Sequence, residues 1–188
     1  MRLRNIPGAD AAITESVYCI KSPETHKGHW QEIFPSQQPL HIEIGMGKGR
    51  FMMDLAAAHP DINYLGIERY SSVLLRALQK MEENPLPNLF FICMDAADVA
   101  EVFDHGEVDR IYFFNPFSIE ILKKVLARVL ESYYENPREL LLFFYYPSDE
   151  YVSYLMTVDE LIFSDEIDCR DLFPGENKRE RIVVFEVE

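Results

Sequence analysis

Short hydrophobic runs alternate with helical patterns through most of the chain. Seven of these runs predict strands, at residues 40–44, 63–67, 89–94, 108–114, 140–146, 161–165 and 181–187. Strands that alternate with helices are typical of βαβ units and a parallel sheet. The run at 140–146 is hydrophobic on both faces, which predicts a central strand. We expect an α/β fold with a mostly parallel seven-stranded sheet, in which the last two strands form an antiparallel edge.

Amphipathic patterns predict the helices that cover this sheet. One helix follows Gly49 and ends at Pro60, and a second begins at Ser71 or Ser72. The longest pattern, at 119–134, places its apolar residues on one face, as expected of a helix that packs on a sheet. Shorter helical segments are predicted at 97–103 and near 150–155. We expect residues 1–35 to form an N-terminal arm and residues 36–188 to form one domain.

Composition and charge narrow the functional classes. The 188 residues are 48% hydrophobic, which is enough for a packed core, and their formal charge of 18 − 32 = −14 favours a solvated acidic surface. Apolar runs of about eight residues are too short to span a bilayer, and no secretory signal is evident, so we expect a cytoplasmic protein. The three cysteines and five histidines show no metal-binding spacing. Acidic residues outnumber basic ones in the rest of the chain, whereas residues 1–50 contain six Lys/Arg and five Asp/Glu.

The first candidate site is a glycine-rich turn between the first strand and the helix that follows it. Gly45, Gly47 and Gly49 alternate with other residues after Glu43, and glycine removes the Cβ atoms that would keep a ligand from the backbone. The spacing is G-x-G-x-G, whereas dinucleotide folds prefer G-x-G-x-x-G. We therefore expect a ligand other than a dinucleotide, and a merely tight turn is the alternative.

Acidic residues follow the second and third predicted strands. Glu68 comes directly after one strand, where a carboxylate can accept hydrogen bonds from the two hydroxyls of a ribose. Asp95 follows the next strand, where it can accept from the exocyclic amine of an adenine. Either acid alone could be an ordinary loop residue. Their occurrence at successive strand ends, after the glycine-rich turn, favours a nucleoside-containing ligand.

Several segments of the first 112 residues resemble the bacterial tRNA (guanine-N7)-methyltransferase family. They are 1–9 (MRLRNIPGA), 27–30 (KGHW), 41–49 (HIEIGMGKG), 64–68 (YLGIE), 74–77 (LLRA), 93–95 (CMD) and 109–112 (DRIY). The resemblance implies a Rossmann-like class I methyltransferase that binds S-adenosylmethionine and has tRNA or another RNA as its partner. The positions expected to bind the cofactor are Glu43, Gly45, Gly47, Gly49, Glu68, Arg69, Asp95 and Ala96.

The second part of the chain departs from that family. Phe117 stands where the family has an aspartate, and the downstream basic stretch expected to hold tRNA is absent. Residues 113–188 instead resemble the distal half of other class I S-adenosylmethionine-dependent methyltransferases. These departures leave open which acceptor is methylated. They also leave the alternative of a module that binds S-adenosylmethionine without transferring its methyl group and acts through an RNA or protein partner.

The candidate acceptor site is Asn115-Pro116-Phe117, at the end of the fourth predicted strand. This segment is similar to the [Asn/Asp]-Pro-Pro-[Tyr/Phe] motif of amino-methyltransferases, with one proline absent. There the Asn side chain accepts from the target amine and the aromatic ring stacks on a planar substrate. The alternative is a turn that ends the strand and caps the helix at Ile119. Tyr145 and Tyr146, at the end of the fifth strand, offer a second aromatic edge for the same cleft, with Tyr146 expected across it; the alternative is that both are buried core residues.

Overall fold

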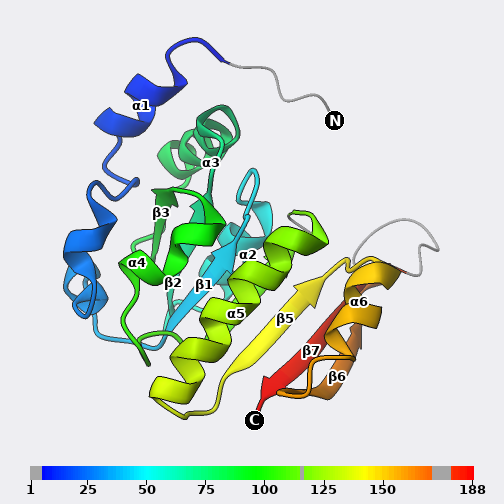
Figure 1. The fold of residues 1–188 in the computed structure, drawn as a ribbon. Helices are drawn as coiled ribbons and strands as arrows, with labels where there is room; N and C mark the ends of the chain where they lie inside the picture. Colours follow the sequence, from blue (N-terminus) through cyan, green and yellow to red (C-terminus); the bar gives the residue numbers. More distant parts are fainter. Residues whose placement is uncertain (1–5, 115–116, 171–178) are drawn as a thin grey trace.

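The computed structural model describes residues 6–114, 117–170 and 179–188. One seven-stranded sheet has the order β3-β2-β1-β4-β5-β7-β6, in which β1 to β5 are parallel and β7 is antiparallel to both of its neighbours. The strands are β1 Leu40–Ile44, β2 Asn63–Glu68, β3 Leu89–Cys93, β4 Arg110–Phe114, β5 Leu141–Tyr145, β6 Leu161–Asp168 and β7 Arg181–Val187. Figure 1 shows this sheet with its helical layers, and the predicted architecture is confirmed.

Helices cover both faces of the sheet. On one face, α2 (Arg50–Ala58) and α3 (Ser71–Glu83) bury an apolar cluster that includes Met52 and Leu74. On the other face, α4 (Val99–Val102), α5 (Ile119–Glu135) and α6 (Asp149–Leu155) pack on β1, β4 and β5 through a second cluster. A 3-10 turn, η3 (Ala96–Asp98), precedes α4. In the described residues, no helix is both long enough and apolar enough to cross a membrane.

The described part of the N-terminal arm packs on the domain. It contains α1 (Ala9–Glu15), η1 (Pro23–His26) and η2 (Trp30–Ile33), and α1 lies against α3. Cys19 forms a parallel bridge with Phe91, so the arm extends the sheet beyond β3. Trp30 is fully buried, and its Nε1 donates to the carbonyl of Val102 at 2.7 Å. The arm therefore contributes to the core that supports the β1 to β3 side of the sheet.

The strand registers bring the candidate segments to one edge of the sheet. Ile44 at the end of β1 pairs with Ile67 of β2 and with Phe113 of β4, and Glu68 pairs with Cys93 of β3. Because these strands are parallel, the loops that follow them leave the sheet at the same end. This edge carries the glycine-rich turn and the two predicted acids.

Candidate functional site

The glycine-rich turn runs from β1 into α2 with all three glycines in left-handed conformations. The φ angles of Gly45, Gly47 and Gly49 are 77°, 61° and 69°, a region that side chains disfavour. A Cβ on Gly49 would lie 2.9 Å from the Cβ of Ala77, so this glycine allows α2 to pack closely on α3. A Cβ on Gly47 would meet no protein atom within 4 Å. Gly47 therefore faces open space, as expected where a ligand approaches the backbone.

Glu68 fastens this turn to the end of β2. Its Oε2 accepts from the backbone N–H of Gly47 at 3.0 Å, and its Oε1 accepts from that of Tyr70 at 2.8 Å. Burial raises the pKa of this carboxyl group above its ordinary value, although the backbone N–H groups of Tyr70, Gly47 and Arg69 oppose that rise. A carboxylate offers about four acceptor positions, so these bonds leave room for a further donor such as a hydroxyl group.

Asp95 organises the segment after β3. Its Oδ1 accepts from the backbone N–H of Ala97 at 3.0 Å and so caps η3. Its Oδ2 lies 2.9 Å from Nη1 of Arg69, which follows Glu68 in the chain. This ion pair connects the loops after β2 and β3, and both of its members were predicted to contact the cofactor.

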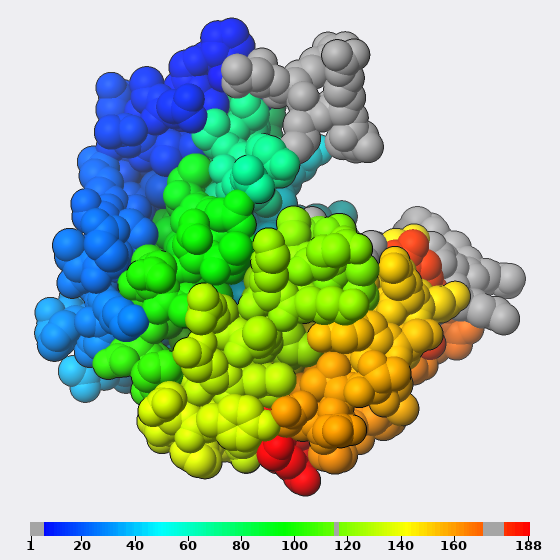
Figure 2. Space-filling view, in the orientation of Figure 1, coloured from blue at the N-terminus to red at the C-terminus, as the bar shows by residue number. Residues whose placement is uncertain are grey.

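These loops enclose a cavity of about 290 Å³, referred to below as the first cleft. Five of the predicted cofactor-binding residues line it, namely Gly45, Glu68, Arg69, Asp95 and Ala96. Phe117, Ser118 and Ile121, at and before the start of α5, also line the cavity. In Figure 2, the surface is hollowed between α3 and the beginning of α5, on this side of the molecule.

Glu43 lies beneath this edge of the sheet and is not part of the cavity wall. Its side chain is fully buried on β1, which pairs it with Gly66 on one side and Tyr112 on the other. Among the described residues, neither of its carboxyl oxygens has a hydrogen-bond partner. Burial, with a smaller contribution from Glu68, raises its pKa to about 8. Burial therefore favours the protonated form of Glu43 at neutral pH, and its carboxyl group is enclosed by the sheet and does not open to the first cleft.

The predicted acceptor segment is described only at its end. Asn115 and Pro116 lie outside the described residues, so their assigned role stays a prediction. The ring of Phe117 makes an edge contact with Phe113, at a centroid distance of 6.4 Å, and its carbonyl accepts from the hydroxyl of Tyr151. Phe117 thus packs on the core and on the first cleft, and its proposed contact with an acceptor also stays a prediction.

A larger cavity, of about 440 Å³, lies on the other side of the glycine-rich turn and is referred to below as the second cleft. Met46 and Gly47 line it beside four aromatic residues, which are Phe51, Phe114, Tyr145 and Tyr146. Of these four, the sequence analysis places Tyr145 and Tyr146 at an acceptor cleft. Phe114 and Phe51 were interpreted as parts of a strand and a helix face. The sequence feature that could have placed Phe114 at the cleft is its position as the last residue of β4, at the edge of the sheet that carries the candidate site.

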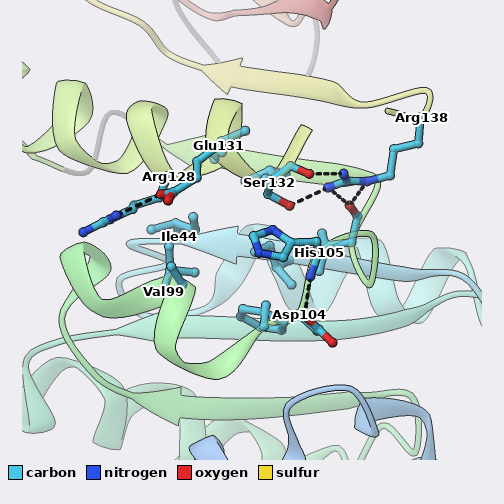
Figure 3. Close-up of a pocket in the computed structure, with 14 residues that line it drawn as sticks. Ile44, Val99, Asp104, His105, Arg128, Glu131, Ser132 and Arg138 are labelled. Carbon is cyan, nitrogen blue, oxygen red and sulfur yellow. Dashed lines mark hydrogen bonds and ion pairs between the residues drawn. The ribbon is translucent and has the colours of Figure 1, made fainter. Parts of the chain in front are cut away.

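A third cavity, of about 60 Å³, lies between α4 and α5 away from the glycine-rich turn (Figure 3). Apolar residues such as Ile44 and Val99 form much of its wall. The guanidinium of Arg138 donates to the carbonyls of Val108 and Ser132 and so ends α5 against the loop before β4. Because this cavity is small and its wall is largely apolar, we interpret it as a gap in the packing between α4 and α5.

The chain is similar in sequence to proteins described as tRNA (guanine-N(7)-)-methyltransferases. A tRNA (guanine-N(7)-)-methyltransferase from Lachnoclostridium phytofermentans is 54% identical over 112 residues, which are 60% of this chain and 52% of that protein. The protein of the same description from Geobacillus sp. is 51% identical over 113 residues, which are 60% of this chain and 51% of that protein. The chain thus spans about half the length of the curated relatives it matches.

Solved structures with little sequence identity share the fold. A 16S rRNA (adenine(1408)-N(1))-methyltransferase variant from Catenulisporales acidiphilia, solved with its cosubstrate SAM, superposes with a TM-score of 0.60 at 14% identity. The match covers 89% of this chain and 91% of that chain. A Streptococcus mutans protein in complex with SAH gives a TM-score of 0.60 at 12% identity and covers 90% of this chain and 99% of that chain.

A family model identifies the chain more directly. Residues 37–136, which include the glycine-rich turn, Glu68, Asp95 and all of α5, match the model. The matched segment covers more than half of the 188 residues. The chain therefore belongs to the family described as "Putative methyltransferase".

Proposed function

We propose that this chain transfers a methyl group from S-adenosylmethionine to a base of an RNA. The observation that carries the proposal is the first cleft, where Gly45, Glu68 and Asp95 lie together at the ends of three parallel strands. Ligands of open α/β sheets bind at this edge. The relatives named as tRNA methyltransferases support an RNA acceptor and a cytoplasmic place of action.

The residues of the first cleft fit the chemistry of this cofactor. Glu68 has acceptor positions beyond its two backbone bonds for the hydroxyls of a ribose. Asp95, held in place by Arg69, offers an acceptor for an exocyclic amine. Gly45, whose φ of 77° lies in the left-handed region, brings the backbone of the turn to the cavity wall without a side chain.

When it is bound, S-adenosylmethionine supplies an electrophilic methyl group on a sulfonium centre, and an acceptor nitrogen can displace the sulfur directly in line. Such a transfer needs no covalent bond to the protein. The work of this chain is therefore to orient the two partners and to keep water from the reacting atoms. Glu68 orients the donor side through its hold on the Gly47 loop, and apolar residues such as Met94 and Phe117 keep the cavity wall dry.

A labelled-methyl assay tests the proposal. The purified chain is incubated with methyl-labelled S-adenosylmethionine and, in separate reactions, with unmodified bulk tRNA, other RNA and a protein extract. Label in an RNA fraction that is lost in Glu68→Ala and kept in Glu82→Ala supports the proposal, because Glu82 lies exposed on α3 outside the cleft. Label in protein alone contradicts the RNA acceptor.

A second candidate function is a module that binds the cofactor without transferring its methyl group. It is favoured by Phe117, which stands where the resembled family has an aspartate and whose apolar ring offers no carboxylate to the cleft. The formal charge of −14 also disfavours tight binding of a polyanion. This candidate predicts calorimetric binding of S-adenosylmethionine with no label transferred to any acceptor fraction.

A further inference from the structure

The second cleft is lined by an ordered series of aromatic rings. Phe51 of α2 stacks on Tyr145 at a centroid distance of 5.5 Å and an interplanar angle of 20°. Tyr145 stacks in turn on Phe114 at 4.8 Å and 18°, and Phe114 lies 6.4 Å from Tyr146. Although Tyr145 is buried, 42% of Phe114 is exposed. The series therefore contains one accessible ring, that of Phe114, which stacks on the buried ring of Tyr145.

The charged residues of this cleft balance one another. Lys48 and Arg50 line it with Asp54 and Glu180, which gives two cations and two carboxylates. Oε2 of Glu180 accepts from the hydroxyl of Tyr145 at 2.9 Å, which holds the carboxylate beside the aromatic series. A balanced rim offers little attraction to a phosphate chain, whereas exposed aromatic rings beside a carboxylate suit a flat ring with N–H donors.

Tyr146 is held in a conformation that residues other than glycine rarely adopt. Its φ angle is 52°, in the left-handed region, and such strain persists where neighbouring contacts impose it. Its N–H donates to the carbonyl of Arg181 at 2.9 Å. Arg179 donates to the carbonyls of Tyr146 and Pro147, and its guanidinium lies 4.3 Å from the centroid of the Tyr146 ring. Arg179 therefore contacts both the backbone and the ring of Tyr146.

We propose that the second cleft binds the acceptor base, with Phe114 as its stacking surface and Glu180 as an acceptor for its N–H groups. Arg179 is a positioning residue that holds Tyr146 as a wall of the cleft. The inference rests on the proposed function, because it assigns the acceptor side of the same reaction. It places that side against Met46 and Gly47, which belong to the turn that also borders the first cleft through Gly45.

Two small probes separate stacking from hydrogen bonding. Guanosine carries N–H donors on its base, whereas caffeine is a flat purine with none. Both are titrated by NMR into the full chain saturated with S-adenosylhomocysteine. Stacking on one aromatic side chain contributes about 1–3 kcal/mol, so Phe114→Leu should weaken both probes between about five- and 150-fold. Glu180→Gln should weaken guanosine at least about fivefold and leave caffeine unchanged.

The control for Phe114→Leu is Phe163→Leu, because Phe163 on β6 is 47% exposed and does not line the cleft. We expect this control to bind both probes as the unchanged chain does. Arg179→Gln should weaken both probes at unchanged cofactor affinity. Arg179→Lys should restore part of the binding, because its ammonium can keep the contact with the Tyr146 ring. Equal losses in the lysine and glutamine variants would contradict the positioning role.

The outcomes distinguish this inference from the proposed function. If the chain binds S-adenosylhomocysteine but neither probe, or if Phe114→Leu leaves both affinities unchanged, the acceptor-base assignment is wrong and the cofactor site stands. If guanosine binds in a Phe114-dependent way while S-adenosylhomocysteine does not bind, the base-binding cleft stands and the proposed methyl transfer fails. Transfer of label to a protein in the absence of probe binding would assign the cleft to a peptide and overturn the proposal.

Discussion

Replacing Glu68 by alanine gives the most direct test of the first cleft. Glu68 is buried, with 8% of the residue exposed, and its carboxyl group accepts two hydrogen bonds from backbone N–H groups. A hydrogen bond to a charged group contributes about 1.5–3 kcal/mol, and Glu68→Ala removes the two part-buried bonds from the N–H groups of Gly47 and Tyr70. We therefore expect the free energy of unfolding to fall by about 2 kcal/mol or more, even without cofactor.

The same substitution should weaken S-adenosylhomocysteine binding beyond its effect on folding. A hydrogen bond to a charged group contributes about 1.5–3 kcal/mol, which corresponds to roughly a 10- to 150-fold loss of affinity. Calorimetric titration below the unfolding temperature of the variant measures this loss, and Glu82→Ala is the control. Glu68→Gln should retain more stability, because its amide oxygen can still accept from one of the two donors. A folded Glu68→Ala chain with unchanged affinity would refute the assignment of Glu68 to the ligand.

Three further predictions concern the same edge of the sheet. Gly47→Val should abolish calorimetric cofactor binding, because its φ of 61° disfavours valine and a shift of the turn would break the bond from its N–H to Glu68, which lines the first cleft. In the folded chain the pKa of Glu43 is about 8, above its ordinary 4.5, so between these two values the folded chain keeps a proton that the unfolded chain loses. The free energy of unfolding, measured with denaturant, should therefore fall from pH 5 to pH 8, and it should fall less steeply in Glu43→Gln. Formation of N7-methylguanosine on tRNA should be weak, and tRNA binding should depend only weakly on salt concentration. Robust N7-methylguanosine in a nucleoside digest would contradict the inference that Phe117, in place of an aspartate, weakens this transfer.

Strand ends were the most predictable feature of this protein. The runs 40–44 and 181–187 have the predicted bounds, and the other strands differ by a few residues. Because parallel strands end at one edge, placing Glu68 and Asp95 directly after strands was enough to bring them to one cavity. The glycine-rich turn was equally accessible to sequence reasoning, since three alternating glycines between a strand and a helix need a structural reason.

Contacts between distant segments were not predictable. Nothing in the local sequence pattern shows that Glu68 accepts a hydrogen bond from the N–H of Gly47, or that Asp95 forms an ion pair with Arg69. The aromatic series of the second cleft joins α2, β4 and β5, and its members look like core residues in each segment separately. Residues 1–35 were predicted as an arm by their lack of pattern. Burial of Trp30 shows how closely the described part packs, and the division at residue 35 stays a prediction.

The sheet order explains why two clefts meet at one turn. From β1, the chain proceeds through α2 to β2 and β3 on one side, whereas β4 and β5 lie on the other side of β1. The loop after β1 enters α2 on one face, and α5, which follows β4, covers the opposite face. The loops therefore separate between β1 and β4, and ligands of such sheets bind at this reversal of strand order. Gly45 lines the cavity beside β2 and β3, and Gly47 lines the cavity beside β4 and β5, so one short turn can border both a methyl donor and its acceptor.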